Sequence, residues 1–144
     1  MRVASIQFEM ADRPKAQNVE HALALLDRVP EADLILLPEI WPCGFFAFDR
    51  YAAESEPLDG PTVAAFRRKA HARRCHLLMG SLVERNADGL FNTTVLIGPD
   101  GEIAACYRKI HLFGYQSDDL VIHKAQVVSW PTPGGWPLQP VEHW

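Results

Sequence analysis

The sequence predicts a single-domain α/β protein, and three observations support this prediction. Residues 3–37 follow a strand–helix–strand pattern whose second strand is a continuous apolar run. The composition, 48% hydrophobic and 22% charged, is that of an ordinary globular protein. The length of 144 residues suits one domain, which at this size buries roughly 70% of the surface of its unfolded chain.

The first half of the chain supplies the parallel part of this fold. A strand is expected over residues 3–8, where side chains for opposite faces alternate. A helix is expected over residues 15–29, because apolar residues recur there at helical spacing and form one stripe. Pro30 ends this helix, since the residue before a proline disfavours helical dihedral angles. The apolar run over residues 33–37 then indicates a buried parallel strand.

The pattern changes after a long loop. Residues 41–60 are irregular and rich in aromatic side chains, and a loop of this length in a compact domain is usually functional. A second helix is expected from Pro61 to about Arg74, with the proline in its first turn. Three strand-like runs follow as an antiparallel meander, separated by turn sequences: residues 76–83, 90–97 and 103–108.

Charge and hydropathy exclude several classes of protein. The net charge of −4 provides no basic surface for nucleic acid. No run of about 18 apolar residues is present, so no membrane-spanning helix is expected. The N-terminal residues lack the apolar core and cleavage site of a secretory signal. Three cysteines, an odd number, argue against a disulfide framework and favour a reducing cytoplasm.

Two charged residues that follow predicted strands are the first candidates for a functional site. Glu39 lies just past the buried strand, at the sheet edge where open α/β proteins bind ligands, and a carboxylate there would suit a general base. The alternative is an acid that caps the loop or pairs with an arginine. Lys109 follows the last strand, where its charge would stabilise a developing oxyanion. The alternative is a solvated lysine beside Arg108.

The cysteines and histidines favour structural interpretations. Cys43 and Cys106 are better explained as small buried side chains than as thiolate nucleophiles, which need a cationic setting and a base within reach. His71, Cys75 and His76 resemble half of a metal site, but no second pair lies at ligand spacing, so no metal is expected.

The role of the aromatic side chains in the long loop stays open between two interpretations. The loop's aromatic side chains either line a pocket or hold the loop down: Phe45, Phe46, Phe48 and Tyr51. His111 is expected to be a partly exposed loop histidine. From Trp130 on, proline and tryptophan dominate without any period, which excludes a central strand.

Three stretches of the chain resemble the carbon–nitrogen hydrolase (nitrilase) superfamily. The first is RVASIQF, and the second is ADLILLPEIWPCGF, in which a strand leads to Pro-Glu and a glycine follows five residues after the glutamate. The third is GLFNTTVLIGPDGEIAACYRKIHLFGY, which is similar to the family's segment with an early asparagine, a Pro-x-Gly turn and Tyr-Arg-Lys-x-His-Leu-Phe. They occur in the family's order and cover residues 1 to about 119.

The resemblance implies a Glu-Lys-Cys mechanism, in which a cysteine thiolate attacks the carbon of an amide, carbamoyl or nitrile group. Carried over by motif, Glu39 is the general base and Lys109 is the cation that stabilises the oxyanion. No cofactor or metal is implied, since side chains alone carry this chemistry. The expected substrate is a small linear amide or carbamoyl compound, because the YRKIHLFGY loop is similar to the amidase-like branches.

The chain also departs from the family, whose nucleophilic cysteine comes well after the lysine, whereas no cysteine follows Lys109 here. The resemblance therefore implies a partial α-β-β-α sandwich: a truncated N-terminal half over residues 1–119, followed by an atypical Pro/Trp-rich tail over residues 120–144. We expect a frameshift or a premature stop near residue 120 to explain this arrangement. We also expect the chain alone to be inactive.

The alternative function is a non-catalytic half-fold that binds a partner or a ligand. A flavodoxin-like binding domain is disfavoured, because no phosphate-binding loop follows the first strand. We expect Glu39 and Lys109 to lie within several ångströms of each other in a shared pocket. A half-sandwich also leaves an apolar sheet face without its covering layer, to be covered by the tail or by another copy in a homo-oligomer. The side chains expected on that face include Leu34, Leu36, Leu78 and Val95 or their neighbours.

Overall fold

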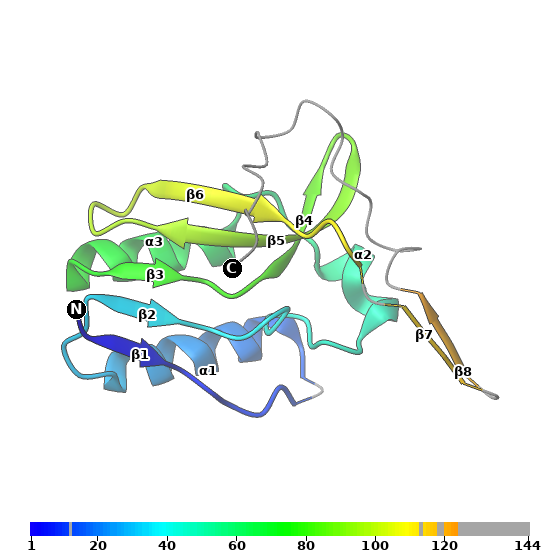
Figure 1. Ribbon diagram of the computed structural model, residues 1–144, viewed down its shortest axis with the longest axis horizontal. Coiled ribbons are helices and arrows are strands. Elements are labelled where there is room, and N and C mark those ends of the chain that lie inside the picture. Colours follow the sequence, from blue (N-terminus) through cyan, green and yellow to red (C-terminus); the bar gives the residue numbers. More distant parts are fainter. Residues whose placement is uncertain (12, 113, 118–119, 124–144) are drawn as a thin grey trace, which may run out of the picture.

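The computed structural model describes residues 1–11, 13–112, 114–117 and 120–123, and Figure 1 shows its elements. They follow one another as β1 (Val3–Ser5), α1 (Lys15–Arg28), β2 (Leu34–Leu36), the 3-10 helix η1 (Phe48–Arg50), α2 (Tyr51–Glu54), α3 (Pro61–Arg73), β3 (His76–Leu78), β4 (Leu82–Asn86), β5 (Gly89–Ile97), β6 (Ile103–Arg108), β7 (Gly114–Ser117) and β8 (Leu120–His123). The α/β class that the sequence predicts is confirmed, and both long helices end within one residue of the expected positions.

Within the described residues, six strands form one mixed sheet. β1, β2 and β3 are parallel neighbours, and β3, β4 and β6 pair antiparallel with β5. β3 and β4 share one edge of β5, since Leu78 pairs with Leu96 and Leu82 with Thr93. Residues 79–81 therefore interrupt what the sequence predicts as a single strand, and this interruption lies beside the candidate site.

β7 and β8 form a separate antiparallel hairpin beyond the end of β6 (Figure 1). This hairpin was not expected from the sequence, and β8 begins at the proposed start of the tail, residue 120. The proline- and tryptophan-rich stretch from Trp130 lies outside the described residues, so the interpretation of this stretch stays a prediction.

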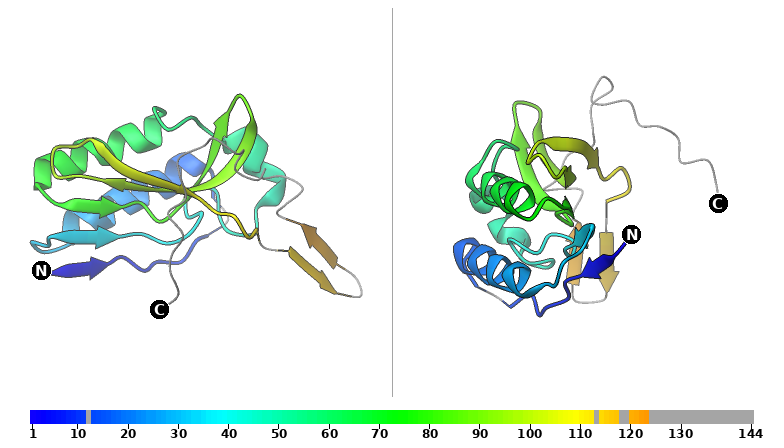
Figure 2. Two further views of the ribbon diagram at one scale, coloured as in Figure 1. Left: turned by 45° about the horizontal axis from the view of Figure 1, so that its top comes forward. Right: turned by 90° about the vertical axis from the view of Figure 1, so that its left-hand side faces the viewer.

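The hydrophobic core lies between the sheet and the two long helices, which cover the same face of the sheet (Figure 2). Its buried side chains come from both helices and from alternate strand positions: Ala22, Leu26, Ile35, Val63, Phe66, Ala70, Leu77, Val95 and Ile97. Burying one large apolar side chain contributes about 1.5–3 kcal/mol, so this layer holds the strands in register.

The opposite face of the sheet carries no helix of the described part of the chain (Figure 2). Leu36, Leu78 and Leu96 lie next to one another across three strands on this face and are only half-buried, as is Leu34. The expectation of apolar side chains outside the core is therefore confirmed for the three predicted leucines. It is wrong for Val95, which is fully buried because its side chain lies on the helix-covered side of β5.

We expect this open face to make the purified chain self-associate. Apolar patches beyond a few hundred Å² are rare on the surfaces of stable monomers. The half-buried leucines on this face form an apolar patch. Val3 in β1 and Tyr107 in β6, which are 53% and 47% exposed, extend this patch toward the two edges of the sheet. Sedimentation velocity should therefore show associated species whose share grows with concentration. A single monomeric species with cooperative thermal unfolding would contradict this expectation.

Candidate active site

Glu39 lies in a tight turn just after β2. The N–H of Ser81 donates to the carbonyl oxygen of Pro38 at 3.2 Å, and the N–H of Ile40 donates to Oγ of Ser81 at 3.0 Å. Both residues next to Glu39 are thus bonded to the interruption between β3 and β4. The turn that carries the candidate base is fixed from both sides.

Two unusual backbone conformations permit this turn. Gly80 has φ +62°, and a Cβ there would lie 1.7 Å from the carbonyl oxygen of Pro38, so only glycine fits. Ile40 has φ +48°, a region that β-branched residues avoid, and its fully buried side chain offsets the strain. Beyond it, the Trp41 indole N–H donates to the carbonyl oxygen of Met79 at 2.8 Å. Glu39 therefore sits on a strained and buried support.

Lys109 reaches the same place from the end of β6. Its N–H donates to the carbonyl oxygen of Asn92 at 2.8 Å, which extends the β5–β6 ladder beyond the last strand residue. Thr94 pairs with Tyr107 in the same ladder. Because successive strand side chains point to opposite faces, those of Asn92, Thr94, Tyr107 and Lys109 all lie on the open face.

Two side chains donate to the same oxygen atom of Glu39. Nζ of Lys109 and Nδ2 of Asn92 each donate a hydrogen bond to Oε1 of Glu39 at 2.8 Å. The predicted proximity of Glu39 and Lys109 is therefore confirmed, while their catalytic roles stay predictions. Their side chains are 39% and 32% exposed, so solvent screens the ion pair and it contributes little to stability.

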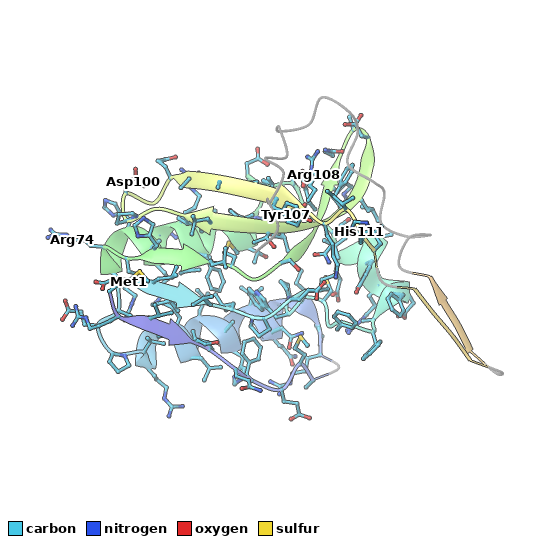
Figure 3. The ribbon with its side chains drawn as sticks, in the orientation of Figure 1. Met1, Arg74, Asp100, Tyr107, Arg108 and His111 are labelled. Atoms are coloured by element: carbon cyan, nitrogen blue, oxygen red, sulfur yellow. The ribbon has the colours of Figure 1, made fainter. Side chains whose placement is uncertain are left out.

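An open pocket of about 350 Å³ surrounds this group. Its lining residues are Glu39, Leu78, Gly80, Ser81, Asn92, Thr94, Tyr107 and Lys109. Figure 3 shows Tyr107 and Arg108 near the end of β6, immediately before Lys109. The pocket thus combines a carboxylate, an ammonium, an amide and three hydroxyl groups on one side of the sheet.

Asn92, Ser81 and Tyr107 were not assigned to the site from the sequence. Asn92 is 2% exposed in β5, where two threonines follow it. Its place at the start of the family-like segment was the available signal, and a buried amide needs a hydrogen-bond partner. Ser81 and Tyr107 carried no comparable signal, since a serine beside a glycine and a tyrosine in a strand are both common.

The cysteines lie outside this pocket. Cys43 and Cys75 are buried, Cys106 is half-buried, and none of the three lines the pocket. Burial raises the pKa of the Cys43 thiol to about 12 and raises that of Cys106 above its ordinary value. Both thiols are therefore protonated at neutral pH and are poor nucleophiles, in agreement with the structural interpretation of Cys43 and Cys106.

The aromatic side chains of the long loop pack against one another. Phe45, Phe46, Phe48 and Tyr51 form successive edge contacts, with ring centroids 4.9, 6.3 and 5.5 Å apart. The Tyr51 hydroxyl also donates to the carbonyl oxygen of Phe45 at 2.7 Å. None of the four lines the pocket, so the structure favours their role in holding the loop. His111, labelled in Figure 3, is exposed.

Within the described residues, no three His, Cys, Asp or Glu side chains gather closely enough to hold a metal ion. His71, Cys75 and His76 accordingly form no such group. In the same part of the chain, no helix has the length and hydrophobicity needed to cross a membrane.

Comparison with known proteins identifies the family. The sequence model of the carbon-nitrogen hydrolase family matches residues 2–138. The chain belongs to this family. The match extends into residues 120–144, and the boundary that we placed after residue 119 stays a prediction.

Relatives in this family are considerably longer than the chain. The nitrilase and fragile histidine triad fusion protein NitFhit of Drosophila melanogaster is 34% identical over an alignment of 124 positions, which covers 83% of this chain and 26% of that protein. Omega-amidase NIT2 of Homo sapiens is 34% identical over an alignment of 116 positions, which covers 78% of this chain and 41% of that protein. Among solved structures, the carbon-nitrogen hydrolase superfamily protein XC1258 of Xanthomonas campestris matches with a TM-score of 0.70 and 32% identity, over 78% of this chain and 41% of that one. The chain spans less than half the length of each.

Proposed function

We propose that the chain is the N-terminal half of an amidase-like carbon–nitrogen hydrolase, which acts on non-peptide C–N bonds of a small linear amide or carbamoyl compound. The observation that carries this proposal is the meeting of Lys109 and Asn92 on one carboxylate oxygen of Glu39 in an open pocket. The similarity to an omega-amidase supports an amide as the substrate. In this proposal residues 1–119 form the hydrolase half-domain and residues 120–144 form an atypical tail.

The position of each charged side chain supports a separate role. Glu39 serves as the general base, which accepts a proton from a thiol and later from water. The hydrogen bond from Lys109 orients this carboxylate. Lys109 also places a positive charge in the pocket, where it stabilises the substrate's carbonyl oxygen as that oxygen becomes negative.

The covalent step needs a thiolate in addition. Attack on the amide carbon forms a C–S bond and an oxyanion, whose collapse breaks the C–N bond and passes the proton held by Glu39 to the leaving amine. Water then attacks the thioester carbon while Glu39 again accepts a proton. The C–S bond breaks, the carboxylic acid leaves, and the proton held by Glu39 returns to the sulfur. No cysteine follows Lys109 in the sequence, and Cys43, Cys75 and Cys106 do not line the pocket. We therefore propose that this chain is inactive alone.

A binding module is the second candidate function. The observation that favours it is a pocket with polar groups of several kinds but no thiol from the described cysteines. A thiol-directed amide analogue distinguishes the two functions once a half that carries the cysteine is supplied. A hydrolase half then supports a single stoichiometric labelling that depends on Glu39, whereas a binding module supports none.

The expectations about partners and location stay proposals. A small amide or carbamoyl compound is the expected ligand, and copies of the chain are expected to associate over the open face. The mechanism needs no cofactor, because side chains carry every step. The three cysteines are free thiols, which supports a reducing cytoplasm.

The proposed function is tested by supplying the missing half. We expect a fusion of residues 1–119 to the C-terminal portion of omega-amidase NIT2 to release ammonia from a small amide. In this fusion, Glu39→Gln and Lys109→Met should each lower kcat by at least about 100-fold, the size expected for losing a general base or an oxyanion-stabilising group. Cys43→Ala is the matched control and should leave the rate unchanged, since Cys43 lies outside the pocket.

Equal rates in the active fusion and in both charge variants would refute the assigned roles. If the fusion does not fold, a second measurement uses the 144-residue chain itself. A small amide titrated into it should shift the NMR signals of the Asn92 side-chain amide, and Lys109→Met should abolish this shift. An unshifted Asn92 signal at saturating amide would contradict the pocket's assignment.

A further inference from the structure

A buried carboxylate that the proposed mechanism does not use joins the strands that carry the pocket. Glu84, in β4, is 3% exposed and accepts three hydrogen bonds. Arg108 donates two of them, from Nη2 to Oε1 at 2.5 Å and from Nε to Oε2 at 2.9 Å. The hydroxyl of Thr93 donates the third, to Oε2 at 2.6 Å. One side chain thus ties β4 to both β5 and β6.

Arg108 is held by a second contact as well. Its guanidinium carbon lies 4.3 Å from the ring centroid of Phe91, in the geometry of a cation–π interaction. The hydrogen bonds to Glu84 raise the pKa of Arg108 above its ordinary value. A planar guanidinium bonded to both oxygens of a carboxylate tolerates little rotation, so the end of β6 is held in one orientation.

Glu84, Thr93, Arg108 and Phe91 form one network, and the alternation of side chains along the strands connects this network to the pocket. Phe91 and Thr93 flank Asn92 in β5, and Arg108 immediately precedes Lys109. Thr93 and Arg108 also pair directly in the β5–β6 ladder. Because successive side chains point to opposite faces, the network holds one face of these strands while Asn92 and Lys109 project from the other. Each residue bound by the network is therefore the chain neighbour of a residue that touches Glu39.

Stability alone is a weak reason for such a network. Removing two charges from water is costly, and apolar residues of similar volume are often as stabilising as a buried ion pair. The ion pair adds fixed geometry, because its two hydrogen bonds form at only one relative position of β4 and β6.

We propose that Glu84 is a positioning residue, which sets the place of Lys109 through Arg108 and the place of Asn92 through Thr93. The inference deepens the proposed function and rests on it for its catalytic meaning. The positioning role is measured without turnover, so an experiment can contradict it without contradicting the proposed function, and the reverse also holds.

The test compares Glu84→Gln with Glu56→Gln in the full chain. Glu56 is a matched control, because it forms a backbone bridge with Glu84 but its buried carboxylate binds Lys15 and the N–H of Thr62 instead. Hydrogen exchange is followed at the amide of Lys109, which donates to Asn92, and at the amide of Ile6, which donates to Leu36 at the far side of the sheet.

In Glu84→Gln we expect exchange at Lys109 to accelerate at least about tenfold more than at Ile6, because local opening of the ladder end exposes this amide. The NMR signal of the Lys109 ammonium should weaken at the same time, as its bond to Glu39 loosens. Glu56→Gln should change the two amides equally and leave the ammonium signal unchanged. Thr93→Val, a milder change, should act on Lys109 in the same direction as Glu84→Gln.

If Glu84→Gln does not fold, Thr93→Val and Arg108→Lys carry the comparison. Equal acceleration at Lys109 and Ile6 in the Glu84 and Thr93 variants would show that the network supports overall stability only, and would overturn the proposal. Failure of the proposed function has a different signature, namely unchanged rates in the Glu39 and Lys109 variants of the active fusion.

Discussion

Purified as it stands, the 144-residue chain should release no measurable ammonia from small amides, carbamoyl amino acids or nitriles. This is the expected result, because the base and the cation cannot replace the thiolate that forms the covalent intermediate. Removing the nucleophile from a catalytic group that acts as a unit costs about as much as removing all its members. Cys43→Ala and Cys106→Ala are therefore expected to change nothing catalytic.

The measurement is an ammonia-release assay run beside human omega-amidase NIT2 as a positive control. Thermal unfolding of each cysteine variant shows whether the fold survives, since Cys43 and Cys106 pack against buried clusters. Turnover that disappears in Cys43→Ala or Cys106→Ala, with the fold intact, would overturn this prediction. It would mean that a cysteine outside the family's motif had become the nucleophile.

Gly80→Ala has the largest expected effect on the fold. A methyl group there would lie 1.7 Å from the carbonyl oxygen of Pro38, and the φ of +62° is itself unfavourable for alanine. Backbone strain alone is about 1–2 kcal/mol, and moving the Pro38 turn adds the loss of the bonds at Ser81. We expect a loss of at least about 3 kcal/mol in the free energy of unfolding, together with displacement of Glu39.

Gly44→Ala is the matched control for this substitution. Gly44 also has a positive φ, +94°, but the atoms nearest to a methyl group at this position would lie 3.8 Å away, an ordinary contact. Its loss of stability should therefore reflect backbone strain without a clash. Urea unfolding measures both variants, and the Lys109 ammonium signal reports on Glu39. Equal losses in the two variants, with that signal unchanged, would contradict the role of Gly80 as the close contact that holds the turn.

Local patterns predict much of this fold because they depend on near neighbours in the chain. The apolar stripe of α1, and the prolines at residues 30 and 61, locate both long helices within one residue. The site pair follows from motifs at two strand ends, Pro-Glu after β2 and Tyr-Arg-Lys at the end of β6. Such motifs name the charged side chain itself, so they predict which residues meet in the site without knowledge of the whole fold.

Other features depend on pairing between distant strands, which the sequence does not display. The break at residues 79–81 exists because β3 and β4 pair with different parts of β5. Val95 was assigned to the wrong face because alternation separates two faces without saying which one the helices cover. The buried position of Glu84 was unpredictable from its type, since charged residues are rarely buried and its partners lie 9 and 24 residues away.

The pocket lies on the face of the sheet that the described helices leave bare, and its lining includes Leu78 and Tyr107 from that face. Any chain that packs there changes the surroundings of Glu39 and Lys109. Small-molecule binding and assembly are then thermodynamically linked, and the coupling is reciprocal. A ligand that prefers the assembled form raises the degree of association, and its apparent dissociation constant falls as the protein concentration rises.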